Sequence, residues 1–159
     1  MPTAQEILSE FEVLSGSVPS VEDLMSTIVE RLHRDRPLYD WVGFYMIEKG
    51  APGADPMLVV GPFIGADTPH KRIPLNSGIC GAAASTGETI VVDDVNSDPR
   101  YLACSIDTKS EIVVPIYLRG AVVGELDIDS HSPAAFGPED RELCERVAQL
   151  VSRYLERNS

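Results

Sequence analysis

The sequence predicts an α+β fold, in which helices at the two ends of the chain bracket an antiparallel sheet. Apolar residues recur at helical spacing near both ends, whereas the middle of the chain holds short apolar runs separated by turn residues. In addition, two strong strand segments in the second half are joined only by Arg119-Gly120. A connection this short requires that the two strands run antiparallel.

Two helices are expected before the sheet begins. Thr3 and Glu6 have the spacing of a capping box, so the first helix should run to about Gly16. Ser20 is the expected cap of a second helix. That helix should end before Pro37, because the residue preceding a proline disfavours the helical conformation.

The central part of the chain predicts a hairpin and then a short helix. Residues 41–47 have the composition of a strand, and residues 57–60 form its partner across a Gly/Pro-rich turn at 50–56. Small residues in 76–87 fit a short helix that leads into a strand at 89–92.

The second half should contain a loop, two strands and the last helix. Residues 93–108 hold turn-forming residues and no apolar period. The two strands pass through Val113 and Val122 on either side of the tight turn. Pro138 stands at a plausible first helical position, so a C-terminal helix should begin there.

Composition restricts the class of protein. A chain of 159 residues with 43% hydrophobic content fits one domain over residues 1–159. The 13 basic and 25 acidic residues give a formal charge of -12, which should repel nucleic acid and anionic membrane surfaces. No export signal or membrane span is expected, so the predicted location is cytoplasmic. Three cysteines without a C-x-x-C pair do not predict a disulfide framework.

Three acidic residues stand out in the two late strands. Asp127 and Asp129 flank Ile128, so in an extended strand their side chains should project to the same face. Glu111 opens the preceding strand. If these carboxyls converge, their mutual repulsion raises at least one pKa and leaves a proton available near neutral pH. The alternative is that they are ordinary strand-end residues that face water.

Each of the three cysteines has a different expected role. Cys104 lies in the polar loop, where it is either a nucleophile that reacts as the thiolate or an incidental thiol. Cys80 has small neighbours and could pair with Cys104 only if the fold brings their Cα atoms within about 7 Å. Cys144 lies on the flank of the apolar stripe of the last helix, which favours a packing role.

Two further groups of residues are candidates for binding a small ligand or a metal. Trp41 and Tyr45 lie four residues apart on one strand, where they form either an aromatic wall for a small ligand or part of the core. A metal site from His70, Cys80 and Cys104 has no ligand-spacing signature, so neither a metal nor a cofactor is predicted.

An ordered set of short motifs runs from Trp41 to the last helix. The motifs are Trp41-Val42-Gly43-Phe44-Tyr45, Gly61-Pro62-Phe63, Arg72-Ile73-Pro74, Gly78-Ile79-Cys80-Gly81, Asp93-Asp94-Val95, Ala103-Cys104, Ser110-Glu111-Ile112-Val113-Val114-Pro115 and Leu126-Asp127-Ile128-Asp129-Ser130. Taken together, they resemble the motifs of the free methionine-(R)-sulfoxide reductases, which are single GAF domains.

The resemblance implies a substrate, a reaction and a set of roles. The implied substrate is free methionine sulfoxide, with thioredoxin as the reductant. Cys104 matches the catalytic cysteine, which attacks the sulfoxide sulfur and becomes a sulfenic acid. The family's substrate-binding carboxylates match Glu111, Asp127 and Asp129. The family's aromatic residues around the substrate match Trp41 and Tyr45.

One position departs from the family pattern. His70 stands where the family commonly has a cysteine that often serves as the resolving thiol. Cys80 matches another family cysteine and is its natural substitute.

Two alternatives stand beside this interpretation. The chain could form a homodimer, and it could be a non-catalytic GAF module that binds a small ligand for signalling. No fused domain that would receive such a signal is expected.

Overall fold

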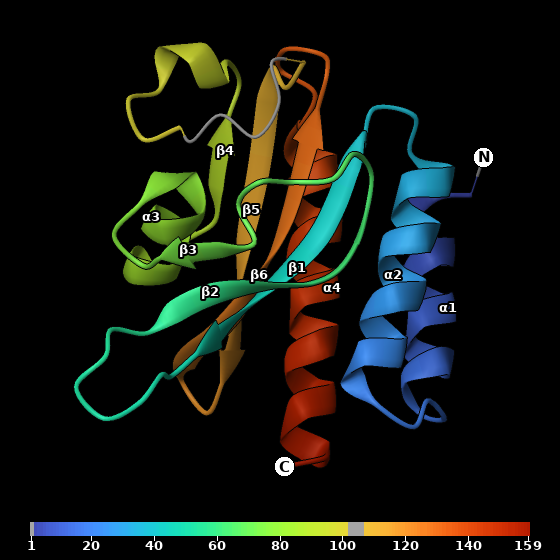
Figure 1. Ribbon diagram of the computed structural model, residues 1–159. Coiled ribbons are helices and arrows are strands. Elements are labelled where there is room, and N and C mark those ends of the chain that lie inside the picture. Colours follow the sequence, from blue (N-terminus) through green and yellow to red (C-terminus); the bar gives the residue numbers. More distant parts are fainter. Residues whose placement is uncertain (1, 102–106) are drawn as a thin grey trace.

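A six-stranded sheet with the strand order β3-β2-β1-β6-β5-β4 forms the centre of the molecule. The computed structural model describes residues 2–101 and 107–159, and every strand pair in this part is antiparallel (Figure 1). The strands are β1 (Trp41–Glu48), β2 (Met57–Ile64), β3 (Arg72–Pro74), β4 (Ile90–Val92), β5 (Ser110–Leu118) and β6 (Ala121–Ser130). The helices are α1 (Ala4–Ser15), α2 (Val21–Asp35), α3 (Gly78–Thr86) and α4 (Pro138–Arg157), with a 3-10 turn at Val95–Ser97. This architecture confirms the predicted α+β class.

The helix ends follow the capping signals of the sequence. The hydroxyl of Thr3 accepts a hydrogen bond from the backbone N–H of Glu6 at 3.1 Å, and α1 starts at the next residue after the cap. The hydroxyl of Ser20 accepts one from the backbone N–H of Asp23 at 3.2 Å and begins α2. Pro138 is the first residue of α4, as predicted.

The two predicted hairpins are present. β1 pairs with β2 across the Gly/Pro-rich turn, and β2 continues to Ile64, four residues beyond the predicted end. β5 and β6 are joined at Arg119 and Gly120, whose φ angles are 51° and 81°. Two successive positive φ angles give the tight turn whose twist matches that of the flanking strands.

The edge strand β3 was not predicted. It contains only three residues, Arg72–Pro74, and pairs with one end of β2. A segment this short shows no alternation that a sequence pattern could reveal, and its proline is typical of edge strands.

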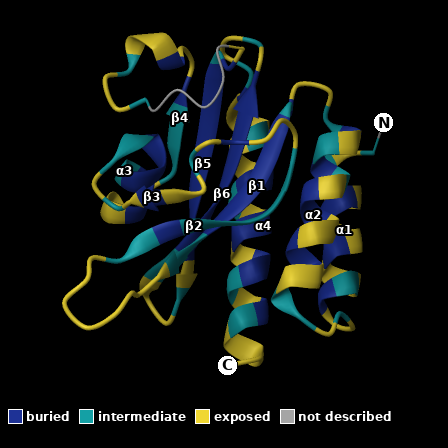
Figure 2. Ribbon diagram, viewed as in Figure 1, coloured by how far each residue is buried: buried dark blue, intermediate teal, exposed yellow. Residues whose placement is uncertain are grey.

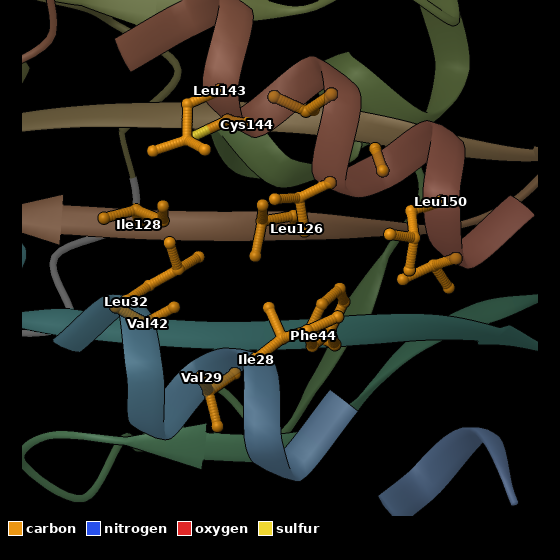
Figure 3. Close-up of a cluster of buried hydrophobic side chains, with 14 of the residues drawn as sticks. Ile28, Val29, Leu32, Val42, Phe44, Leu126, Ile128, Leu143, Cys144 and Leu150 are labelled. Carbon is orange, nitrogen blue, oxygen red and sulfur yellow. The ribbon is translucent and has the colours of Figure 1, made fainter. Parts of the chain in front are cut away.

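The sheet separates two clusters of buried side chains. On one face, α1, α2 and α4 pack against the even-numbered residues of the central strands, which include Ile112. Figure 3 shows Phe44, Leu126 and Ile128 among them. On the other face, α3 packs against the odd-numbered residues. Figure 2 shows that β1, β5 and β6 are buried along most of their length, whereas the tip of the β1–β2 hairpin is exposed. None of the described helices combines the length and the apolar character that crossing a bilayer requires.

Candidate active site

The odd-numbered residues of β5, β6 and β1 form three rows across the sheet face that α3 partly covers. Glu111 pairs with Asp129, which in turn lies opposite Trp41. One row further, Asp127 lies between Val113 and Gly43. Because side chains alternate along a strand, the register itself places the carboxyls and Trp41 on the same face.

A third row adds a carboxyl that the sequence interpretation had not assigned. Glu125 lies between Pro115 and Tyr45, two residues before Asp127. Its side chain is 0% exposed. Side chains alternate along a strand, which predicts that Asp127 and Asp129 share a face, and the same rule places Glu125 on that face. The sequence therefore contained a signal for Glu125.

The four carboxyl groups, those of Glu111, Glu125, Asp127 and Asp129, are buried with few partners. Among the described residues, neither carboxyl oxygen of Glu125 has a hydrogen-bond partner, and the same holds for Oδ1 of Asp127 and of Asp129. In the same part of the chain, no ion pair links any of the four to a basic side chain. Buried polar atoms without partners are costly, so this face is arranged to receive a ligand or protons.

Burial changes the protonation of this cluster. Desolvation raises the pKa of Glu111, Glu125, Asp127 and Asp129 because it penalises the charged form. The neighbouring charge of Asp127 raises the pKa of the other three carboxyls further. Hydrogen bonds from Glu111 and Cys80 partly offset the rise at Asp127. The cluster therefore retains protons to higher pH than exposed carboxyls do, and at Asp127 the hydrogen bonds favour the ionised form.

Cys80 lies at the edge of the same cluster. Its Sγ donates to Oδ2 of Asp127 at 3.4 Å and lies 4.0 Å from Oε2 of Glu111. Cys80 lies near the start of α3, and it reaches this depth because Gly81 lets the helix approach the preceding loop. A Cβ atom at Gly81 would lie 2.9 Å from the carbonyl oxygen of Leu75. Desolvation, followed by the charge of Asp127, raises the pKa of the Cys80 thiol well above its usual value.

Three aromatic rings belong to, or pack against, the buried cluster on the face of the sheet that carries the carboxyls. Trp41 stacks on Phe63, with ring centroids 5.4 Å apart, and on Tyr45 at 6.2 Å. The indole Nε1 of Trp41 donates to the carbonyl oxygen of Ala66 at 3.1 Å. Trp41 and Tyr45 pack in a buried cluster and also line a cavity, so their role as an aromatic wall for a ligand stays a prediction.

The cavity holds about 60 Å³ and lies between the strand ends and the loops that adjoin them. Trp41, Tyr45, Asp127 and Asp129 line it from the sheet. The loop contributions come from Ala66, Asp67, Thr68, Thr108 and His131, together with Asp40 before β1. These loop residues had no signal in the sequence, because only the folded chain brings them to the strand ends.

A more spacious groove of about 510 Å³ lies elsewhere, between α4, β5 and residues 87–89 before β4. Its lining includes Thr89, Tyr117 and Glu145. None of the buried unpartnered oxygens named above belongs to its lining, so volume alone does not identify the reactive site.

The other residues selected from the sequence have different positions. Cys104 lies outside the described residues. Cys144 is fully buried in the core on the opposite face of the sheet, which confirms its packing role, and burial raises the pKa of its thiol to about 12. His70 is near the site through its backbone, since its carbonyl oxygen accepts a hydrogen bond from the Tyr45 hydroxyl at 2.8 Å.

Comparison with known proteins identifies the family. A model of the GAF domain matches residues 20–155. The chain belongs to the GAF domain family. Within this family, the chain is 36% identical over 154 residues to the free methionine-R-sulfoxide reductase of Saccharomyces cerevisiae, covering 94% of this chain and 83% of the relative.

Two solved structures extend the comparison. The free methionine-R-sulfoxide reductase of Neisseria meningitidis, determined in complex with its substrate, superposes with a TM-score of 0.87 at 31% identity, over 98% of this chain and 90% of the other. The type II free methionine-R-sulfoxide reductase of Thermoplasma acidophilum gives a TM-score of 0.78 at 35% identity, over 92% of this chain and 96% of the other. These relatives confirm the family resemblance inferred from the motifs.

Proposed function

We propose that this GAF protein reduces free L-methionine-(R)-sulfoxide to methionine, with Cys104 as the nucleophile and Cys80 as the resolving thiol. The observation that carries the proposal is the buried carboxyl cluster beside a stacked aromatic pair, in a chain whose relatives bear the name of this reductase. Free methionine sulfoxide has an ammonium group, a polar sulfoxide and an apolar S-methyl group, for which the carboxyls and the aromatic rings are complementary partners.

The carboxyl cluster supplies the polar part of this complementarity. A substrate ammonium group would provide hydrogen-bond donors to Asp127 and Asp129, each of which has an oxygen without a partner among the described residues. A methionine sulfoxide inside a peptide lacks that ammonium group. The cluster therefore favours the free amino acid over the peptide-bound form.

A protonated carboxyl supplies the acid. Glu111 lies directly opposite Asp129, and the pKa of each is raised by burial and then by the charge of Asp127. A carboxyl that keeps its proton near neutral pH can donate it to the sulfoxide oxygen as the S–O bond is polarised. We assign this role to the Glu111–Asp129 pair as a unit, since protons in a coupled pair belong to both groups.

The reductive step transfers one oxygen atom to a thiol. The thiolate of Cys104 attacks the sulfoxide sulfur, and a proton from the carboxyl pair accompanies the oxygen to the cysteine. Methionine leaves with its sulfur reduced, and Cys104 is oxidised to the sulfenic acid. The aromatic rings of Trp41 and Tyr45 would hold the S-methyl group of the substrate beside the reacting sulfur.

The recycling step uses the second thiol. Cys80 attacks the sulfur of the Cys104 sulfenic acid, so that a disulfide forms and water leaves. Asp127, whose Oδ2 lies 3.4 Å from Sγ of Cys80, is placed to accept the thiol proton. A dithiol reductant of the thioredoxin class then supplies two electrons and restores both thiols.

The test is a thioredoxin-coupled assay with separate R and S diastereomers of free methionine sulfoxide. We expect turnover of the R form, with little activity on the S form or on peptide-bound methionine sulfoxide. Cys104→Ser should abolish even a single turnover, whereas Cys144→Ser, which changes a thiol in the opposite core, should keep the activity. Equal use of both diastereomers, or methionine production by Cys104→Ser, would contradict the proposal.

The same assay separates the reductase from a non-catalytic GAF module. A module that only binds a ligand would bind methionine sulfoxide, or another small amphipathic molecule, without releasing methionine from either diastereomer. Isothermal titration of the R form with wild-type protein under reducing conditions therefore accompanies the assay. Binding without turnover would support the signalling alternative.

A further inference from the structure

We propose that Cys80, Glu111 and Asp127 together form a Zn²⁺ site, and that zinc bound there blocks the reductase. Each of the three residues offers one ligand atom, and these atoms all lie within 4.8 Å of one another. Glu111 and Asp127 follow Cys80 by 31 and 47 positions along the chain, so no short spacing motif predicts the site. This ligand set differs from the combination of His70, Cys80 and Cys104, for which the sequence has no ligand-spacing signature.

The separations between the ligand atoms suit a zinc ion. Zinc binds thiolate sulfur at about 2.3 Å and carboxylate oxygen at about 2.0–2.2 Å, so tetrahedral geometry places sulfur and oxygen about 3.5 Å apart. Sγ of Cys80 lies 3.4 Å from Oδ2 of Asp127 and 4.0 Å from Oε2 of Glu111. The separation from Asp127 is already close to the tetrahedral value, and a small rotation of the Glu111 carboxyl would bring the other separation to it.

An independent observation places free space beside these atoms. A cavity of about 20 Å³ is lined by all three ligands together with Tyr45 and Ile79. A space of roughly 10–15 Å³ is sufficient for one water-sized occupant. Asp127 is 4% exposed, and its Oδ1 has no hydrogen-bond partner among the described residues. This buried, unpartnered oxygen belongs to a side chain that lines the cavity, as expected for a cation ligand.

The charge and softness of the ligands select the ion. No basic side chain pairs with Glu111 or Asp127 within the described part of the chain, so a divalent cation would supply the missing positive charge. A thiolate ligand favours Zn²⁺ over Mg²⁺ and Ca²⁺, which prefer oxygen ligands. Binding requires that the Cys80 thiol lose its proton, so zinc binding should release protons and strengthen as pH rises.

The effect on activity rests on the proposed function. Zinc would occupy Asp127 and Glu111, which the proposed reaction uses for the substrate, and would tie up the thiol that resolves the sulfenic acid. A zinc-loaded enzyme would therefore neither bind the sulfoxide productively nor recycle. A chelator that removes the ion should restore activity, because no covalent bond has changed.

The experiment measures zinc binding directly and does not depend on turnover. Reduced full-length protein competes with a chromophoric zinc chelator under an inert atmosphere, and we expect one Zn²⁺ per chain. Cys80→Ser should weaken this binding by more than the roughly 10–100-fold that is lost when an outer partner of a metal ligand is removed. Asp127→Asn should weaken it as well, whereas Cys144→Ser, a matched thiol in the opposite core, should retain it.

Two further measurements make the result decisive. Cd²⁺ replaces Zn²⁺ in a parallel titration, and a thiolate-to-cadmium absorption band should appear in wild type and Cys144→Ser but not in Cys80→Ser. Circular dichroism verifies that each variant is folded, and Glu111→Gln provides a second ligand variant if Asp127→Asn fails to fold. Unchanged zinc affinity in folded Cys80→Ser, or the absence of binding to wild type, would overturn the site. Zinc bound as expected without loss of turnover would overturn only the inhibition.

Discussion

Gly43 leaves open the space that the indole ring of Trp41 occupies. A Cβ atom at position 43 would lie 2.3 Å from Cη2 of that ring, which is far inside van der Waals contact. Gly43 also lies opposite Asp127 in the sheet. The missing side chain therefore lets the ring lie flat over the strand and next to the carboxyl cluster.

Gly43→Ala should consequently displace Trp41 and weaken substrate binding. We expect kcat/KM to fall by about tenfold or more, equivalent to roughly 1.4 kcal/mol, mainly through KM. Trp41 is the single tryptophan of the chain, so its fluorescence reports the displacement directly. Gly61→Ala is the matched control, because a Cβ at that strand position has its nearest neighbour at 3.5 Å. Wild-type fluorescence and KM in Gly43→Ala would contradict this role.

Neutral isosteres in the carboxyl cluster should separate activity from stability. Asp129→Asn or Glu111→Gln should lower kcat/KM by at least about tenfold, or roughly 1.4 kcal/mol of transition-state stabilisation. The fold should be little disturbed, since a neutral isostere relieves charge repulsion. Steady-state kinetics with the R sulfoxide give the effect, and Asp55→Asn in the exposed hairpin turn is the control. Wild-type rates in both variants would contradict a role of these two carboxyls in the reaction.

Glu125 makes a prediction about stability and pH. Burial, followed by the charge of Asp127, raises its pKa in the folded state, so the folded protein holds this proton more firmly than the unfolded chain. Its contribution to stability is complete below the unfolded pKa of about 4.3 and is lost as pH rises through the folded pKa. Glu125→Gln keeps a neutral side chain at every pH and removes this loss.

The free energy of unfolding of Glu125→Gln should therefore rise relative to wild type as pH increases above about 4. The difference should grow by up to about 1.4 kcal/mol per pH unit until the folded carboxyl ionises. Urea denaturation at a series of pH values measures it, with exposed Glu30→Gln as the control. A constant difference across this range would show that Glu125 titrates as an ordinary carboxyl.

Recycling should depend on Cys80. After one substrate turnover without reductant, we expect a disulfide between Cys80 and Cys104. Cys80→Ser should still release one methionine per enzyme but lose thioredoxin-dependent cycling. Peptide mapping by mass spectrometry under non-reducing conditions detects the bond. A persistent sulfenic acid on Cys104 with Cys80 reduced, or a disulfide between two chains, would exclude Cys80 as the intramolecular resolving thiol.

Local signals in the sequence were sufficient for most of the fold. The caps at Thr3 and Ser20 and the tight turn at Arg119-Gly120 each act over a few residues, and the structure follows all three. Strand β3 was missed because three residues carry no period. Its position depends on pairing with β2, a contact that only the folded chain provides.

The site was predictable where it follows strand alternation and unpredictable where it depends on contacts between distant segments. Asp127 and Asp129 share a face because they are two residues apart, and Glu125 could have been added by the same rule. The approach of Cys80 to Asp127 was different. It depends on how closely α3 packs against the sheet, which is set by Gly81 and the preceding loop.

Residues that stabilise the core alternate with residues of the site in the second half of strand β6. Leu126 and Ile128 point into the core beneath the three long helices, whereas Asp127 and Asp129 point to the opposite face. A scan of every substitution over residues 125–129 of β6 should therefore yield two alternating profiles. Cellular abundance should fall at the even positions and turnover per folded molecule at the odd ones, so that neighbouring residues in this strand evolve under different constraints.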